Sequence, residues 1–221
     1  MAGECDDTIL PGERGVELKR FMLVLIVVGL AYGSVAFAAT TQIRVDDDFF
    51  FPNAPPVRNV VAGASFQWKS APTATRRHNV RQDFKLFYSG PATTAPINFS
   101  VTASAGTYHY YCEIHGTTTS GMQGVVKVRP TLNANPTGLP FTVIWALAGS
   151  NTGNQFDVRY RVGTTGAWIL WKNNVTTRSA VFGQNGQPVQ VLAGHTYQFQ
   201  VRSQKVPTQP SGFSPTLTVN T

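Results

Sequence analysis

The feature that most constrains this 221-residue chain is an aromatic, strand-like run that leads into a cluster of sulfur and nitrogen donors. The run Tyr108–Tyr111 is followed directly by Cys112, then by His115 and, after a short polar loop, by Met122. A second imidazole, His78, lies upstream. A fold in which these donors act together must bring a strand end, the loop after it and a distant segment to one place.

One thiolate, two imidazoles and a weak axial thioether make the donor set of a mononuclear blue-copper site. Thiolate sulfur favours Cu(I), imidazole suits both oxidation states, and a distant Met leaves the geometry between their preferences. A centre of this kind transfers one electron with little rearrangement. The sequence therefore predicts a copper site with an electron-transfer role.

Other uses of these side chains agree less well with the sequence. A structural zinc site normally has four strong nitrogen or sulfur ligands, and Met is not one of them. A multicopper oxidase would place His on both sides of the Cys, whereas Cys112 lies between Tyr111 and Glu113, and His109 and His195 do not supply a trinuclear cluster. For a Cys–His hydrolase the sequence offers no orienting group or oxyanion donor.

Residues 1–38 have the pattern of an export leader. Lys19 and Arg20 precede the apolar run 21–30, and a small-residue cleavage motif ends at Ala38. We expect cleavage there and an extracytoplasmic location, which is periplasmic, cell-surface or secreted, without stable membrane insertion. The alternative is an uncleaved anchor, because the segment from Phe21 to Ala38 is nearly long enough to span a bilayer.

Removing the leader leaves one thiol and one thioether in the chain. Cys5, Met1 and Met22 all precede residue 38, so Cys112 and Met122 remain. Exported proteins usually pair their cysteines in disulfides. A single thiol therefore needs its own explanation. A buried Cys acting as a small hydrophobic residue is one explanation, but the spacing to a His and a Met favours a metal ligand.

The chain is basic, with 18 Lys and Arg against 11 Asp and Glu and a net charge of +7. The leader contains more acidic than basic residues, so the remainder is more basic still. Electrostatic steering would favour an acidic redox partner protein or an anionic cell surface. Nucleic acid is excluded as a partner, because the basic residues are scattered and no recognition motif accompanies them.

Beyond the leader, short runs of β-branched and aromatic residues are broken by Gly, Pro and Asn, which is typical of an all-β protein. Alternation is visible in both halves, at Ser65–Lys69, Tyr108–Tyr111, Val125–Val128, Phe141–Trp145 and Thr196–Val201. Residues 130–138 are turn-forming and lack periodicity. We interpret them as a linker between two β-domains, residues 39–129 and 139–221.

The donor spacing, together with the strand-like segments around it, resembles the plastocyanin/azurin (cupredoxin) family over residues 41–129. The segments that carry the resemblance are Ile43–Val45, Phe51–Pro52, Val60–Trp68, Gly106–Cys112 and Gly121–Val128. The resemblance implies a Greek-key β-sandwich for the first domain. It also implies that one mononuclear type 1 copper is bound by His78, Cys112, His115 and Met122.

The same resemblance implies roles for two neighbours of the ligands. Asn79 corresponds to a residue that hydrogen-bonds across the ligand loops, where such bonds fix ring orientation and tune the potential. Tyr111 is a candidate for electron exit, and an ordinary surface aromatic is the alternative. The loop 116–121 is longer than in plastocyanin, which leaves the distance from Met122 to the copper open and could leave His115 more exposed than usual.

The second half resembles a fibronectin type III domain, through Trp145, Tyr160 and the segment Leu192–Arg202. The spacing of Leu192 and Tyr197 is similar to a tyrosine corner. We therefore expect an immunoglobulin-like β-sandwich that serves as a spacer or docking module. Trp145 is expected in its core, and burial explains Trp168 and Trp171 better than a binding face does.

Together these features predict an exported blue-copper protein that carries one electron through Cu(II)/Cu(I). A ligand cage with no open coordination position predicts a carrier and not an enzyme. Two alternatives remain open. The same ligands would also serve a copper-binding or delivery protein, and a domain that had become structural would serve as an extracellular scaffold without a redox role.

Overall fold

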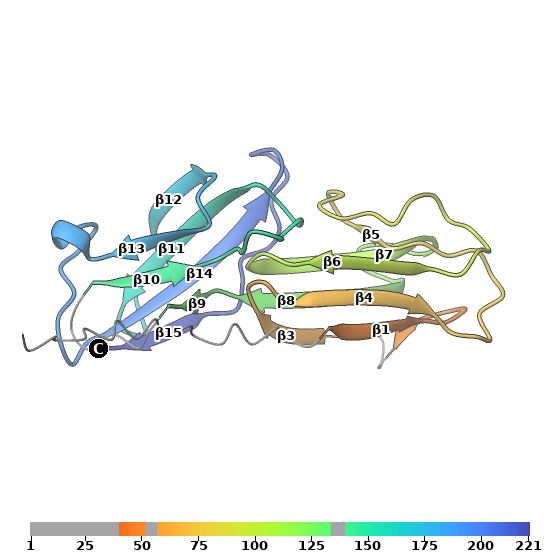
Figure 1. Ribbon diagram of the computed structural model, residues 1–221, viewed down its shortest axis with the longest axis horizontal. Helices are drawn as coiled ribbons and strands as arrows, with labels where there is room; N and C mark the ends of the chain where they lie inside the picture. The colour runs from red at the N-terminus through yellow and green to blue at the C-terminus, as the bar shows by residue number, and fades with distance from the viewer. Residues whose placement is uncertain (1–39, 52–56, 134–139) are drawn as a thin grey trace, which may run out of the picture. The chain divides into compact units, whose positions relative to one another are not determined.

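The computed structural model describes residues 40–51, 57–133 and 140–221, which all belong to one compact unit, residues 36–221. The expected leader and residues 134–138 of the expected linker lie outside the described residues. The described chain consists of strands in four sheets, so the all-β prediction is confirmed (Figure 1). Its single helical segment is the 3-10 turn η1, Gln184–Gly186. Within the described ranges, no helix has the length and apolarity needed to cross a membrane.

Residues 41–129 form two four-stranded sheets. Their strands are β1 (Thr41–Val45), β2 (Phe50–Phe51), β3 (Val57–Val61), β4 (Ser65–Ser70), β5 (Arg81–Gln82), β6 (Asn98–Thr102), β7 (Gly106–Gly116) and β8 (Gly121–Arg129). One sheet has the order β2-β1-β4-β6 and the other the order β3-β8-β7-β5. The pairs β1–β4 and β3–β8 are parallel, and the other pairs are antiparallel.

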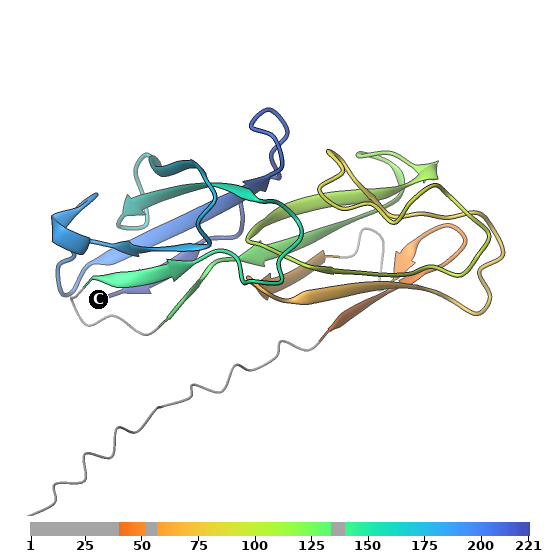
Figure 2. The ribbon, with the colours of Figure 1, turned by 45° about the horizontal axis from the view of Figure 1, so that its top comes forward.

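The alternating sequence places every second side chain of β4 and β7 in the core between these sheets. Trp68 on β4 contacts Tyr110 on β7 edge-to-face, with ring centroids 5.1 Å apart, and Phe50 meets the same tyrosine at 5.0 Å. Figure 2 shows β4 in orange and β7 and β8 in green as facing layers. Each buried aromatic side chain contributes about 1.5–3 kcal/mol, so this cluster fixes how β7 packs against the other sheet.

The rest of the described chain forms two further sheets. Their strands are β9 (Thr131–Leu132), β10 (Phe141–Ile144), β11 (Gln155–Val162), β12 (Ile169–Val175), β13 (Ser179–Phe182), β14 (Thr196–Gln204) and β15 (Leu217–Asn220). The sheet orders are β13-β10-β9 and β12-β11-β14-β15. β9 lies inside the segment expected to be a linker and pairs with β10.

Trp145 is fully buried in this second pair of sheets, as predicted. Trp171 packs edge-to-face on Trp145 at 6.2 Å, whereas the half-buried Trp168 is stacked by arginine side chains. The hydroxyl of Tyr197 donates to the Gln190 carbonyl at 3.3 Å and accepts from the Leu192 N–H at 2.9 Å. These bonds close the turn before β14, which is the arrangement predicted for this tyrosine.

Tyr108 on β7 is buried in a polar cluster that joins segments far apart in the chain. Its hydroxyl donates to the Ser104 carbonyl at 2.8 Å and lies 2.9 Å from Thr152 Oγ1 and 2.7 Å from Ser203 Oγ. Next to it, Thr107 and Gly212 exchange two backbone hydrogen bonds of 2.9 Å. β7 is therefore held both by the side chain of Tyr108 and by the backbone of Thr107. These contacts restrain the part of the strand that leads to Cys112.

Burial of this hydroxyl predicts a loss of stability at alkaline pH. Burial raises the pKa of Tyr108 to about 12 from the ordinary value of 10.0. Above pH 10 the unfolded chain loses this proton first, so stability is intact below about pH 10 and falls by about 2–3 kcal/mol toward pH 12. Denaturant unfolding at pH 9 and pH 11.5 of wild type and Tyr108→Phe checks this. The variant should lose less stability over the interval, and equal losses would show that Tyr108 does not titrate this way.

Candidate metal centre

The regular pairing of β7 with β8 is interrupted where the predicted ligands lie. Tyr111 pairs with Gln123, and the next pair is Gly116 with Gly121. Four residues of β7, 112–115, therefore face a single residue of β8, Met122. An excess of residues on one strand bends it and re-aims its side chains. This bulge places the Cys112–His115 segment opposite Met122 at the end of the hairpin.

Gly121 allows the two strands to close again beyond the bulge. Its φ of 72° lies in the left-handed region that favours glycine. A Cβ at this position would also overlap the carbonyl oxygen of His115. The hairpin backbone can approach the His115 peptide this closely only because residue 121 has no side chain.

His78 reaches the same place from a different segment. It forms an isolated bridge with Thr93, in which the two residues exchange backbone hydrogen bonds of 3.0 Å. The bridge lies just before β5, which pairs with β7 next to Cys112. As a whole residue His78 is 2% exposed, so its ring points inward.

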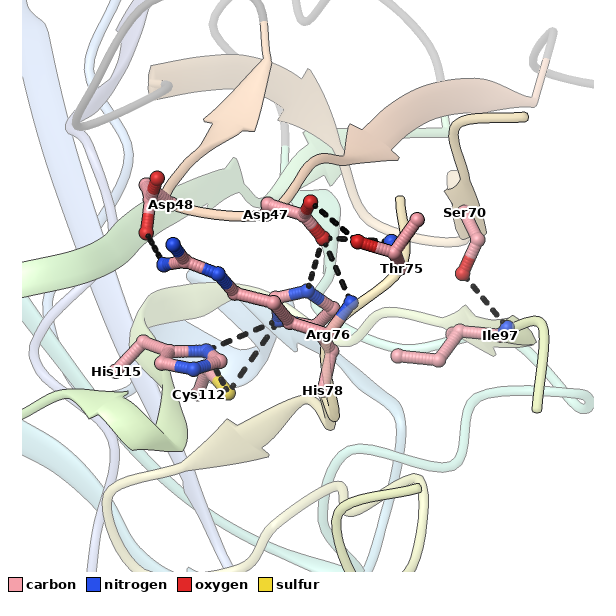
Figure 3. A network of polar contacts seen from close by, with 9 residues as sticks. All are labelled: Asp47, Asp48, Ser70, Thr75, Arg76, His78, Ile97, Cys112 and His115. Atoms are coloured by element: carbon pink, nitrogen blue, oxygen red, sulfur yellow. Dashed lines mark hydrogen bonds and ion pairs between the residues drawn. The ribbon is translucent and has the colours of Figure 1, made fainter. Parts of the chain in front are cut away.

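The donor atoms of His78, Cys112 and His115 converge, with all three atoms within 4.8 Å of one another (Figure 3). Sγ of Cys112 lies 3.9 Å from Nδ1 of His78 and 3.7 Å from Nδ1 of His115. The two Nδ1 atoms are 3.2 Å apart. A point equidistant from these three atoms lies about 2 Å from each, which is a metal–nitrogen bond length. The arrangement therefore fits one metal ion, and a thiolate with two imidazoles suits copper.

Met122 and Cys112 are both fully buried, whereas His115 is partly exposed. The register of the bulge places the Met122 backbone across from the Cys112–His115 segment. The four predicted ligands therefore come from one hairpin and one remote loop. The donor set is consistent with a type 1 copper site in which His115 is the ligand nearest to solvent.

The electrostatic surroundings keep the His115 imidazole available as a ligand. Partial burial lowers its pKa, and the nearby His78 and Arg76 lower it further, against smaller opposing effects of Asp48 and Asp47. A lowered pKa leaves the ring neutral at neutral pH, and a neutral ring has the lone pair that metal binding requires.

Asn79 connects the two ligand segments. It is 1% exposed, and its side-chain oxygen accepts the Glu113 N–H at 2.9 Å. Its amide donates to the Gly90 carbonyl at 3.0 Å and to Glu113 Oε2 at 2.6 Å. The residue after His78 is thus bonded to the residue after Cys112, which restrains the separation of the two ligands.

Glu113 was not among the residues predicted from sequence. Its carboxylate also accepts from Arg81 Nη1 at 2.7 Å and Tyr88 Oη at 3.1 Å. Burial raises the pKa of Glu113, but the three hydrogen bonds to its side chain outweigh this effect and lower the pKa overall. The neighbour of the candidate thiolate ligand is therefore an ionised carboxylate held by three donors.

Asp47 was also missed, although it touches a ligand directly. Its Oδ1 lies 3.2 Å from Nε2 of His78 on the side of the ring opposite Nδ1 (Figure 3). The sequence signal was the run Asp46–Asp48 directly after the first strand. That run marks an acidic turn but does not show which carboxylate faces the centre.

Tyr111 and the loop after His115 border the centre. Tyr111 is half-buried, and the Arg81 guanidinium lies 5.6 Å from its ring centroid. In the loop, the Thr117 hydroxyl accepts the backbone N–H of Ser120 at 3.1 Å, and the Thr117 N–H donates to the Ser120 carbonyl at 2.8 Å. The long polar loop is therefore closed by its own hydrogen bonds.

No protein family and no curated protein matches the sequence. Solved structures that resemble it include a myokine, with 16% identity over 43% of this chain and 94% of the myokine and a TM-score of 0.32. Plastocyanin of Dryopteris crassirhizoma is 18% identical over 40% of this chain and 100% of its own, with a TM-score of 0.31. The blue copper oxidase of Nitrosomonas europaea is 9% identical over 82% of this chain and 85% of its own, with a TM-score of 0.32. At these low scores, the conclusions about the centre come from this chain's own donor atoms.

Proposed function

We propose that this protein is an exported type 1 copper protein that carries single electrons through Cu(II)/Cu(I). The observation that supports it is the convergence of the His78, Cys112 and His115 donor atoms in a largely buried site. Met122 would complete the ligand set as the weak axial donor. Bound copper supplies a one-electron couple, and the chain holds the donors in place for both oxidation states.

The ligand segments are restrained from several sides, which suits a carrier. The bulge of β7 fixes Cys112 and His115, the bridge to Thr93 fixes His78, and Asn79 joins the two segments. A rigid cage changes little between oxidation states, so electron transfer requires little reorganisation. We propose a carrier and not an enzyme, because three strong donors, with Met122 as a weak axial fourth, would leave no open coordination position for a substrate.

The partly exposed His115 supports a route for the electron through its ring edge. Ile114 beside it is 50% exposed, which adds an apolar side chain at this surface. Tyr111 is a second candidate for the path, since it follows Tyr110 on β7 and is bonded to Cys112. We propose a redox partner protein with an acidic docking surface, since the chain carries a net charge of +7.

The leader motif supports an extracytoplasmic location, where the protein would meet its redox partner. The second pair of sheets supports a fibronectin type III-like module, because a three-stranded and a four-stranded sheet enclose Trp145 and the Tyr197 hydroxyl closes a turn. We propose that this module acts as a spacer or docking unit.

The visible spectrum of the copper-loaded protein tests the proposal. We expect an intense thiolate-to-copper band that bleaches with ascorbate and returns on oxidation. A carrier should also retain its copper for hours against a chelator in both oxidation states. Rapid loss of copper in either state would favour delivery of the metal, and a colourless protein that binds copper weakly would favour a structural role.

A further inference from the structure

The carboxylate of Asp47 is built into the segment that carries His78. Asp47 lies in the turn between β1 and β2. Its Oδ1 accepts the Thr75 N–H at 2.8 Å and the Arg76 N–H at 2.9 Å, and its Oδ2 accepts the Thr75 hydroxyl at 3.1 Å. Thr75 and Arg76 lie three and two residues before His78. The carboxylate and the imidazole are therefore held by one segment and keep their relative positions.

The contact between Asp47 and His78 decides which nitrogen of the ring carries the proton. The Thr75 and Arg76 N–H groups and the Thr75 hydroxyl all donate to the Asp47 side chain, which therefore acts as an acceptor in this turn. An anionic carboxylate only accepts hydrogen bonds. The proton of the neutral ring must therefore lie on Nε2, 3.2 Å away, and the Nδ1 lone pair faces the other donors.

The contact between Asp47 and His78 differs from an ordinary surface ion pair in its burial. The His78 side chain is 3% exposed and the Asp47 side chain 29% exposed, so solvent screens the contact only from one side. Asp48, the next residue, provides a contrast. Its side chain is 67% exposed, and it pairs with Arg76 Nη1 at 2.6 Å. Two adjacent carboxylates thus have the same formal charge and different access to the centre.

We propose that Asp47 is a positioning residue that fixes the tautomer of His78 and lowers the reduction potential of the centre. This inference rests on the proposed function, and it concerns the regulation of the same site. A carboxylate on the outer nitrogen makes a ligating imidazole a stronger donor. A stronger donor and a nearby negative charge both stabilise the more positively charged oxidised state. The chain therefore sets a lower potential than the ligands alone would give.

The experiment compares Asp47→Asn with its neighbour Asp48→Asn. The amide oxygen of Asn can still accept from Nε2–H and from the loop, so Asp47→Asn removes the charge and keeps the hydrogen bond. We expect it to shift the ratio of reduced to oxidised copper at least tenfold toward the reduced form, which is about 59 mV for one electron. This shift should persist in about 1 M salt, where the Debye length is about 3 Å, whereas any shift from Asp48→Asn should collapse.

A second readout does not need copper. Long-range ¹⁵N–¹H correlation spectra of the metal-free protein report which ring nitrogen of His78 carries the proton. We expect Nε2–H alone in wild type and in Asp47→Asn, and a substantial Nδ1–H population in Asp47→Ala. Unchanged spectra in Asp47→Ala, or equal salt-sensitive potential shifts in the two Asn variants, would refute the role of Asp47. A wild-type protein without the thiolate band would refute the proposed function instead, and the spectra would still decide the role of Asp47.

Discussion

Replacing Cys112 by Ser is expected to abolish the intense visible band of the copper-loaded protein. The band requires a thiolate bonded to copper, and Cys112 is the free thiol of the described residues. Copper affinity should fall by at least about 100-fold, because even the loss of a partner outside the ligand set typically costs about 10–100-fold. Absorption spectra and competition with a chelator measure the two effects.

The fold should survive this change, since Ser is close to Cys in shape and size. His109→Gln is a suitable control, because His109 is an exposed residue of the same strand and lies outside the donor cluster. This variant should keep the band and the affinity of wild type. A band that remained in Cys112→Ser, or that disappeared in His109→Gln, would show that the ligands have been assigned incorrectly.

The ligands could be predicted from sequence because their chemistry and spacing are local. Cys112, His115 and Met122 lie in one hairpin, so the chain itself keeps them close. His78 was the remote donor, and the structure brings its Nδ1 to 3.9 Å from the Cys112 sulfur. Sequence order alone specifies no such distance, and the signals for this residue were its donor type and the family resemblance.

The carboxylates near the centre depend on tertiary structure. Three consecutive acids, Asp46 to Asp48, are equivalent as sequence, and only the turn between β1 and β2 brings the middle one to His78. Glu113 is likewise an ordinary strand residue in the sequence. It becomes part of the centre because Asn79, Arg81 and Tyr88 come from another segment to bond with it.

The fold shows the same division between local and non-local information. Period-two alternation predicted strands such as β4 and β7, since the pattern follows from the pleat itself. The parallel pairing of β1 with β4 and of β3 with β8 joins segments with no local signal for each other. The short strand β9 was not foreseen, because two residues are too few to show a period and the strand exists through its pairing with β10.

Replacing Trp68 by Ala is expected to lower the free energy of unfolding by about 3–5 kcal/mol, the cost typical of removing a large buried aromatic side chain. Trp68 is fully buried and lies at the centre of an aromatic cluster. Its ring centroid is 5.2 Å from that of Phe87, 5.8 Å from that of Phe99 and 5.1 Å from that of Tyr110. The cavity would open beneath β7, so we also expect the copper-loaded variant to lose copper faster than wild type.

Two further variants show whether the loss of stability in Trp68→Ala comes from the buried cavity or from the loss of any large aromatic side chain. The indole N–H of Trp68 has no hydrogen-bond partner among the described residues, so Trp68→Phe loses ring volume but no hydrogen bond, and it should cost only about 1–2 kcal/mol. Trp168→Ala removes a half-buried indole stacked on Arg159 and Arg161 and should cost about 1 kcal/mol. Denaturant unfolding of the metal-free proteins gives all three values. Trp68 connects the sheet of β4 to β7, the strand that carries Cys112. A Trp68→Ala cost as small as that of Trp168→Ala would therefore mean that this cluster does not support the centre.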